Sequence, residues 1–203
     1  MKLSAPIYVH WELTNVCNLK CLHCYQQNDI QKASLPEDKV FLIAEKLIRS
    51  GIFQATLTGG EPFILPYLEK LVRYFNSSGI SPQISSNGTI LNDKIVQWLS
   101  DVNIRLLQIS LDSHKAETHD YIRQSEGAFN RVIKSIALLK KGNVPVSVAF
   151  CASSKNYREV EPLIQLAISL GLSKISIGEI MPLYGRDSVR KSFIQRGGIH
   201  SIR

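Results

Sequence analysis

Three cysteines near the start of the chain are the residues whose types and spacing point most directly to chemistry. Cys17, Cys21 and Cys24 follow an apolar stretch typical of a strand, at a C-x3-C-x2-C spacing. Thiolates this close together repel one another unless a metal neutralises their charge. A structural zinc ion takes four ligands, and an ordinary cubane cluster takes four cysteines. Three cysteines would leave one iron of a [4Fe–4S] cube open to a substrate or cofactor, which is a catalytic arrangement.

Two further motifs lie at the ends of expected strands, residues 59–62 (GGEP) and residues 110–112 (SLD). With the cysteine motif and the aromatic residue after it, they resemble the radical S-adenosylmethionine (radical SAM) superfamily over about residues 7 to 186. The resemblance implies that Cys17, Cys21 and Cys24 hold a [4Fe–4S] cluster whose open iron is chelated by S-adenosylmethionine. One electron then breaks a sulfur–carbon bond of this cofactor and yields a 5′-deoxyadenosyl radical.

The GGEP motif has two interpretations. Gly59 and Gly60 lack Cβ atoms, so the backbone there can approach a ligand closely and adopt positive φ. The resemblance implies that this loop binds the methionyl amino group, with help from Glu61. A strand-to-helix turn that ends at Pro62 is the simpler alternative, although its place one β-α unit after the cysteine loop favours cofactor binding.

Two later strand ends carry polar residues. Ser110 and Asp112 alternate around Leu111, so their side chains are expected on one face, and the resemblance implies that they bind the ribose hydroxyls. Ser86 and Asn87 are a second candidate contact to the cofactor. The Asn-Gly dipeptide that begins at Asn87 is equally a strong turn signal.

Two more cofactor contacts are expected by resemblance. Arg123 falls where related enzymes carry a cation facing the methionyl carboxylate, an anion that a guanidinium binds in bidentate fashion. The alternative is a surface ion pair with Asp120 or Glu126. Tyr25 is expected near the adenine, with a core aromatic as the alternative.

His23 and Cys151 are given simpler interpretations. A Cys3His zinc site through His23 is geometrically awkward, because His23 lies between two of the cysteines and would have to converge with both. Cys151 follows the fifth expected strand and is interpreted as a buried free cysteine. Its position at the rim of the expected barrel leaves a role in substrate binding open.

The residues that carry these motifs must be positioned by an alternation of strands and helices. Six β-branched runs, mostly continuous as in strands covered on both faces, span residues 7–13, 54–58, 83–86, 106–111, 144–149 and 174–177. Helices are expected after residues 34, 66, 92, 129 and 157, the first with a capping box of Ser34 and Glu37. This alternation requires a parallel sheet with right-handed crossovers, and six units cannot close an eight-stranded barrel. The expected α/β fold is therefore a (βα)6 partial TIM-like barrel, the usual fold of the resembled superfamily.

Composition is that of an ordinary globular protein, with 203 residues, 44% hydrophobic and 20% charged. No apolar run nears the roughly 18 residues of a membrane span, and a cytoplasmic location is expected. Residues 1–186 are expected to form a radical SAM core domain and residues 187–203 a basic, poorly ordered tail or truncated extension. Much of the net charge of +7 falls late in the chain, in Arg186, Arg190, Lys191, Arg196 and Arg203, with only Asp187 opposing it, so nucleic acid is not favoured as a partner.

Three functions are compared. The first is a radical SAM enzyme that abstracts hydrogen from a peptide or small-molecule substrate, reduced by a flavodoxin or ferredoxin, and similar to the core of the peptide and cofactor maturases. Those relatives usually carry a C-terminal cysteine-rich SPASM extension, which this sequence does not show. A truncated or partner-dependent cluster-binding module is therefore the second interpretation, and a structural zinc-binding module is the third.

Overall fold

The structure, a computed structural model, describes residues 7–26 and 33–180. Its six strands form one parallel sheet in which every strand lies beside the next one in the sequence, in the order β1-β2-β3-β4-β5-β6. The strands are β1 (Tyr8–Thr14), β2 (Gln54–Gly59), β3 (Gln83–Ser86), β4 (Leu106–Ser110), β5 (Val146–Ala152) and β6 (Ile175–Glu179). All six expected strands are confirmed, with ends that differ by at most three residues.

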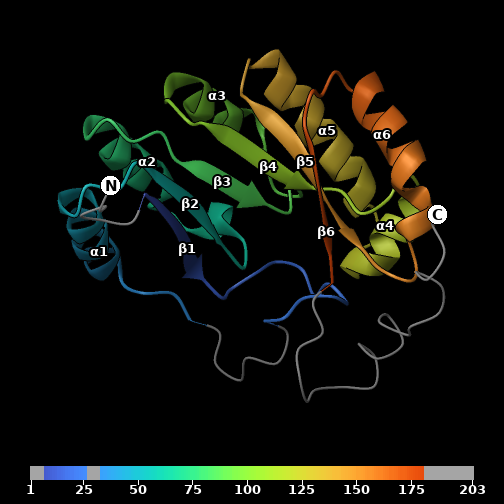
Figure 1. Cartoon of the computed structure of the whole chain (residues 1–203), viewed down its shortest axis with the longest axis horizontal. Helices are drawn as coiled ribbons and strands as arrows, with labels where there is room; N and C mark the ends of the chain where they lie inside the picture. Colours follow the sequence, from blue (N-terminus) through green and yellow to red (C-terminus); the bar gives the residue numbers. More distant parts are fainter. Residues whose placement is uncertain (1–6, 27–32, 181–203) are drawn as a thin grey trace, which may run out of the picture.

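Helices connect the strands and lie along one side of the curved sheet (Figure 1). Their bounds are α1 (Glu37–Arg49), α2 (Leu68–Ser77), α3 (Asp93–Asp101), α4 (Ala116–Arg123), α5 (Ala128–Lys141) and α6 (Val160–Ser169), with short 3-10 helices η1 (Pro62–Ile64) and η2 (Tyr157–Glu159). The expected fold, an α/β partial barrel of six parallel strands, is confirmed.

The two faces of the sheet differ in chemistry because side chains alternate along a strand. One face is apolar: Leu57, Ile84 and Leu107 are fully buried in the main core with the helices. The other face is polar, and there the Gln108 side chain donates a hydrogen bond to Ser176 Oγ at 3.0 Å. The strands are thus anchored from the helical side, which leaves polar groups on the opposite face.

The first helix begins differently from the expectation. The capping box of Ser34 and Glu37 is wrong: Pro36 occupies the N-cap position and no side chain caps the helix. The hydroxyl of Ser34 instead lies 2.6 Å from the hydroxyl of Thr14, and the two residues form an isolated antiparallel bridge. Ser34 therefore fastens the chain before α1 to the end of β1.

Helix α4 was not expected from the sequence. Its buried residues are His119, Ile122 and Arg123, so two of the three positions facing the protein interior are polar. A pattern search for apolar residues at helical spacing cannot detect such a helix.

No helix of the described residues has the length and apolar character needed to cross a membrane. The expected basic tail, residues 187–203, and the last residues of the expected core domain lie outside the described residues.

Candidate active site

The cysteine loop directly follows β1 and is tied to helix α4. Cys21 is buried, whereas Cys17 and Cys24 are half-buried. Between them, the Leu22 N–H donates to the Ile122 carbonyl at 2.8 Å. The loop thus crosses from the carboxyl end of the first strand to a helix that follows the fourth strand.

Hydrogen-bond donors point at the sulfurs of Cys17 and Cys21. The Leu19 N–H donates to Cys17 Sγ at 3.4 Å, and the side-chain amide of Asn87 donates to the same sulfur at 3.7 Å. Cys21 Sγ accepts from Nη1 of Arg123 at 3.7 Å. Donors of this kind stabilise thiolates, as a cluster requires.

Burial is the largest influence on two of these thiols. It raises the pKa of Cys17 and of Cys21, while the Leu19 N–H opposes the rise at Cys17 and the charge of Arg123 opposes it at Cys21. Positive charge near a buried sulfur, such as that of Arg123 beside Cys21, favours its thiolate form.

Three cysteines on one loop can be compared with the ligand sets of a single metal ion and of a cluster. Across residues 7–26 and 33–180, no three His, Cys, Asp or Glu side chains gather closely enough to hold one metal ion. Sulfurs that share a zinc ion at about 2.3 Å must lie about 4 Å from one another, whereas each cysteine of a cube binds a different iron. The three cysteines and their donors fit a [4Fe–4S] cluster.

The two glycines of the GGEP motif lie against the backbone that leads into the cysteine loop. The Gly60 N–H donates to the Thr14 carbonyl at 2.6 Å, and the Glu61 N–H donates to the Val16 carbonyl at 2.9 Å. A Cβ on Gly59 would lie 2.2 Å from the Thr14 oxygen, and one on Gly60 would lie 2.0 Å from the Val16 oxygen. The backbone at Gly59 and Gly60 must therefore pack closely against residues 14–16, which leaves no space for a Cβ at either glycine.

Glu61 connects the ends of the second and third strands. It is fully buried, and its carboxylate accepts hydrogen bonds from the Asn87 N–H at 2.8 Å, the Ser86 hydroxyl at 2.9 Å and the Phe63 N–H at 3.1 Å. Burial raises the pKa of Glu61 to about 7, and these hydrogen bonds oppose the rise only in part. Glu61 is thus a structural link between two loops of the site.

Asn87 extends this network to the cysteine loop. Its side-chain amide also donates to the Asn18 side-chain oxygen at 2.8 Å, while its own oxygen accepts from the Thr89 N–H at 2.9 Å. The Asn18 amide in turn donates to the Thr89 hydroxyl at 2.9 Å. Asn87 therefore both forms the turn after β3 and contacts the cysteine loop. Sequence reasoning missed Asn18, whose position between two cysteines was its only signal.

Asp112 and Arg123 form a buried ion pair. Arg123 Nε lies 2.7 Å from Asp112 Oδ2, in a charge contact that lacks hydrogen-bond geometry. Burial alone would raise the pKa of Asp112, but the charge of the guanidinium, together with smaller contributions from His23, His119 and the Cys151 N–H, lowers it overall. The other oxygen of Asp112 accepts from the Cys151 N–H at 3.1 Å. Ser110, in contrast, is half-buried at the end of β4.

Arg123 does not pair with the two surface carboxylates considered from the sequence. The Asp120 carboxylate accepts instead from the Gly127 N–H at 2.6 Å and the Phe129 N–H at 2.7 Å, at the start of α5. His119 was also missed from the sequence. Burial lowers the pKa of His119 to about 4, and its neutral ring accepts a hydrogen bond from the Asp112 N–H at 3.1 Å.

The remaining candidates lie at the edges of this arrangement. The hydroxyl of Tyr25 donates to the Glu12 carboxylate on β1, and the ring is half exposed. Cys151 is half-buried and packs with Leu22 beside the small cluster of Ile122 and Ile180. Burial, followed by the nearby Asp112 charge, raises the pKa of the Cys151 thiol to about 11. His23 is half-buried within the cysteine loop.

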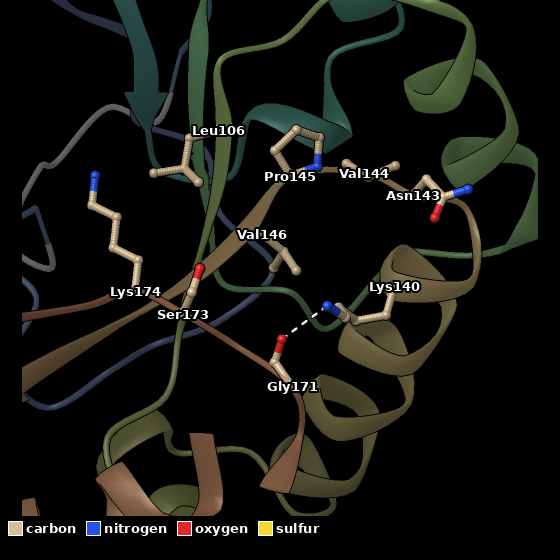
Figure 2. Close-up of a pocket in the computed structure, with 9 residues that line it drawn as sticks. All are labelled: Leu106, Lys140, Asn143, Val144, Pro145, Val146, Gly171, Ser173 and Lys174. Atoms are coloured by element: carbon tan, nitrogen blue, oxygen red, sulfur yellow. Dashed lines mark hydrogen bonds between the residues drawn. The ribbon is translucent and has the colours of Figure 1, made fainter. Parts of the chain in front are cut away.

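A separate hollow of about 370 Å³ lies at the opposite ends of the strands. Figure 2 shows its lining near the first residues of β4 and β5, where the Lys140 ammonium donates to the Gly171 carbonyl at 2.8 Å. None of the predicted site residues lines this hollow. The chemistry is expected at the carboxyl ends of the strands, where ligands bind in parallel α/β folds.

The sequence pattern of the Radical SAM superfamily matches residues 11–167. The chain belongs to this superfamily. An AdoMet-dependent heme synthase of Methanosarcina barkeri is 31% identical over 181 residues, which cover 88% of this chain and 52% of the synthase. The subtilosin biosynthesis protein AlbA of Bacillus subtilis is 30% identical over 173 residues, which cover 84% of this chain and 39% of AlbA.

The fold agrees with that of a solved structure. Streptococcus suis SuiB, crystallised with S-adenosylmethionine, aligns with a TM-score of 0.80 at 17% identity, over 90% of this chain and 42% of SuiB. The radical SAM chain described here thus spans about half the length, or less, of these relatives.

Proposed function

We propose that this radical SAM chain binds a [4Fe–4S] cluster through Cys17, Cys21 and Cys24, with S-adenosylmethionine at the open iron. When bound, the pair of cofactors supplies a 5′-deoxyadenosyl radical for hydrogen abstraction from a substrate. The observation that carries the proposal is the convergence of donors from two separate elements on one loop: Asn87, after β3, reaches Cys17, and Arg123, at the end of α4, reaches Cys21.

The residues of the GGEP and Asn87 loops act in this proposal by holding the cysteine loop in place. Gly59 and Gly60 allow the backbone to pack against residues 14–16, and Glu61 joins that segment to Ser86 and Asn87. Backbone groups of these same loops are the proposed contacts to the methionyl amino group. Burial of the Glu61 carboxylate supports an indirect role for it, through the loops that it connects.

The proposed contacts to the ribose and to the methionyl carboxylate are assigned to residues near the carboxyl ends of the strands. Ser110 is proposed to bind the ribose, because it is half-buried at the end of β4. Asp112 and Arg123 remain predicted contacts to the ribose and the methionyl carboxylate, although in this structure each is engaged by the other. Tyr25 remains a predicted neighbour of the adenine, and its hydrogen bond to Glu12 supports a fixed position beside the cysteine loop.

A peptide is the substrate class that the relatives favour. AlbA is named for bacteriocin biosynthesis, and SuiB was also crystallised with its precursor peptide. A small-molecule substrate is the alternative, because another relative is named a heme synthase. A flavodoxin or ferredoxin is the proposed source of the electron.

A second function is a cluster-binding module that depends on a partner or on further sequence for turnover. The observation that favours it is coverage: the chain corresponds to 52% of the heme synthase and 39% of AlbA. A zinc-binding module, the third interpretation, has less support because the chain belongs to the radical SAM superfamily.

Anaerobic reconstitution of the 203-residue chain with iron and sulfide tests these functions. The proposal predicts a brown protein with about four irons per chain, which releases 5′-deoxyadenosine when reduced with dithionite in the presence of S-adenosylmethionine. Bound cluster without release would favour the module, and zinc uptake without iron uptake would favour the third interpretation.

Two cysteine variants provide the matched comparison. Cys21→Ala removes a proposed ligand and should abolish cluster retention. Cys151→Ala removes a thiol from the same end of the sheet and should leave the iron content unchanged. Equal loss of iron in both variants would contradict the assignment of ligands.

A further inference from the structure

A buried ion pair lies directly behind one corner of the proposed cluster. Asp112 is fully buried, Arg123 is 7% exposed, and their charged groups are 2.7 Å apart. Arg123 Nη1 also reaches Cys21 Sγ at 3.7 Å, whereas the recorded contacts of the Asp112 carboxylate are with Arg123 and the Cys151 N–H. The guanidinium is therefore the member of the pair that touches the cysteine.

The environments of two proposed ligands differ in charge. Cys17 accepts hydrogen bonds from the Leu19 N–H and the Asn87 amide, which are neutral donors. Cys21 accepts from a cation. A cation–sulfur contact shielded from water is stronger than a neutral one, so of these two cysteines Cys21 has the stronger donor.

Asp112 holds the guanidinium in this position. Removing one partner of a buried pair leaves an uncompensated charge, which is strongly unfavourable. The Asp112 side chain is itself fixed by the Cys151 N–H, and its backbone N–H donates to His119 on the same helix as Arg123. The pair is thus fastened both to β5 and to α4.

We propose that Arg123 stabilises negative charge on the cluster through its contact with Cys21, and that Asp112 is the positioning residue that holds Arg123 there. This inference rests on the proposed function, because it requires a cluster bound by the three cysteines. Reduction adds one electron, and hence one negative charge, to the cluster. A cation beside a ligand sulfur favours that added charge and raises the reduction potential.

The test removes the pair without changing the net charge. Asp112→Asn/Arg123→Gln replaces both buried charges by amides and keeps an oxygen at residue 112 for the Cys151 N–H. The matched control is Glu69→Gln/Arg73→Gln, which removes an exposed helical pair whose charged atoms lie 2.9 Å apart. Each reconstituted chain is titrated with dithionite in the absence of S-adenosylmethionine, and the reduced cluster is followed by electron paramagnetic resonance.

The double variant should keep its iron and show a reduction equilibrium at least tenfold less favourable, which is about 59 mV for a one-electron couple. The control should match the unaltered chain. Arg123→Lys, which keeps the charge on a shorter side chain, should lie between them. The Arg123→Lys variant also tests the inference if the double variant fails to fold.

Several results would overturn the inference. An unchanged potential with weakened binding of S-adenosylmethionine would assign the pair to the cofactor instead. Loss of iron from a folded double variant would assign it to cluster assembly, and a potential for Arg123→Lys equal to that of the double variant would exclude charge as the cause. Absence of a cluster in the unaltered chain would contradict the proposed function itself, which is a distinct result.

Discussion

Gly60→Ala is a substitution for which the structure predicts a large effect beside the cysteine loop. The added Cβ would lie 2.0 Å from the Val16 carbonyl oxygen and 2.5 Å from its carbon. Both are backbone atoms, so no side-chain rotation can relieve the clash. Relief requires separating residues 59–61 from residues 14–16, which immediately precede Cys17.

The cost can be worked from the contacts that would be lost. Separation would weaken the hydrogen bonds from Gly60 to Thr14 and from Glu61 to Val16, at about 0.5–1.5 kcal/mol each. Overpacking adds about 1–3 kcal/mol, so the free energy of unfolding should fall by roughly 2–6 kcal/mol. That is a large part of the roughly 5–15 kcal/mol that stabilises a typical domain.

Urea unfolding followed by circular dichroism measures this loss, and iron content after reconstitution measures its effect on the cysteine loop. Gly178→Ala is the matched control, because its Cβ would meet no atom within 4 Å and its φ is not positive. Gly51→Ala, at φ +77° with open space around it, measures the cost of backbone strain alone. Equal stability and iron content in Gly60→Ala and Gly178→Ala would refute the reasoning.

Three further predictions concern the network around the site. Because the pKa of Glu61 is about 7 in the fold, above its ordinary value, its contribution to stability is present below about pH 4.5 and is lost as the pH rises through 7. We expect the free energy of unfolding of the unaltered chain, relative to that of Glu61→Gln, to fall by about 3 kcal/mol across this pH range. If urea unfolding shows that this difference does not change with pH, the burial argument is contradicted. Asp120→Ala should lower the unfolding free energy by about 1–2 kcal/mol, because two N–H groups at the start of α5 lose their acceptor; thermal unfolding beside Asp101→Ala checks this. Asn87→Ala should speed amide hydrogen exchange in residues 17–24, and unchanged exchange would show that the amide does not hold the loop.

Much of the fold could be predicted because its signals are local. Six β-branched runs in alternation with helices require a parallel sheet. The expectation that its strands are covered on both faces was wrong, because the helices cover one face (Figure 1) and the other carries polar groups such as Gln108 and Ser176. Helix α4 was missed because His119 and Arg123 occupy its buried face, where a pattern search expects apolar residues. The predicted capping box was wrong for a related reason: the Ser34 hydroxyl contacts the hydroxyl of Thr14 on β1, twenty residues away, and does not cap helix α1.

The cysteine spacing and the order of the motifs along the chain are properties of the sequence alone, and they sufficed to indicate the superfamily and the class of cofactor. Only the tertiary structure decided which groups serve each cysteine. The contacts of Arg123 with Cys21 and of Asn87 with Cys17 join residues 102 and 70 positions apart. Nothing in the local pattern around either residue specifies such a pairing, because it depends on how parallel strands bring their carboxyl ends to one edge. The same burial that places Asp112 and Arg123 together makes their charges strong there, and burial is a property of the packed fold.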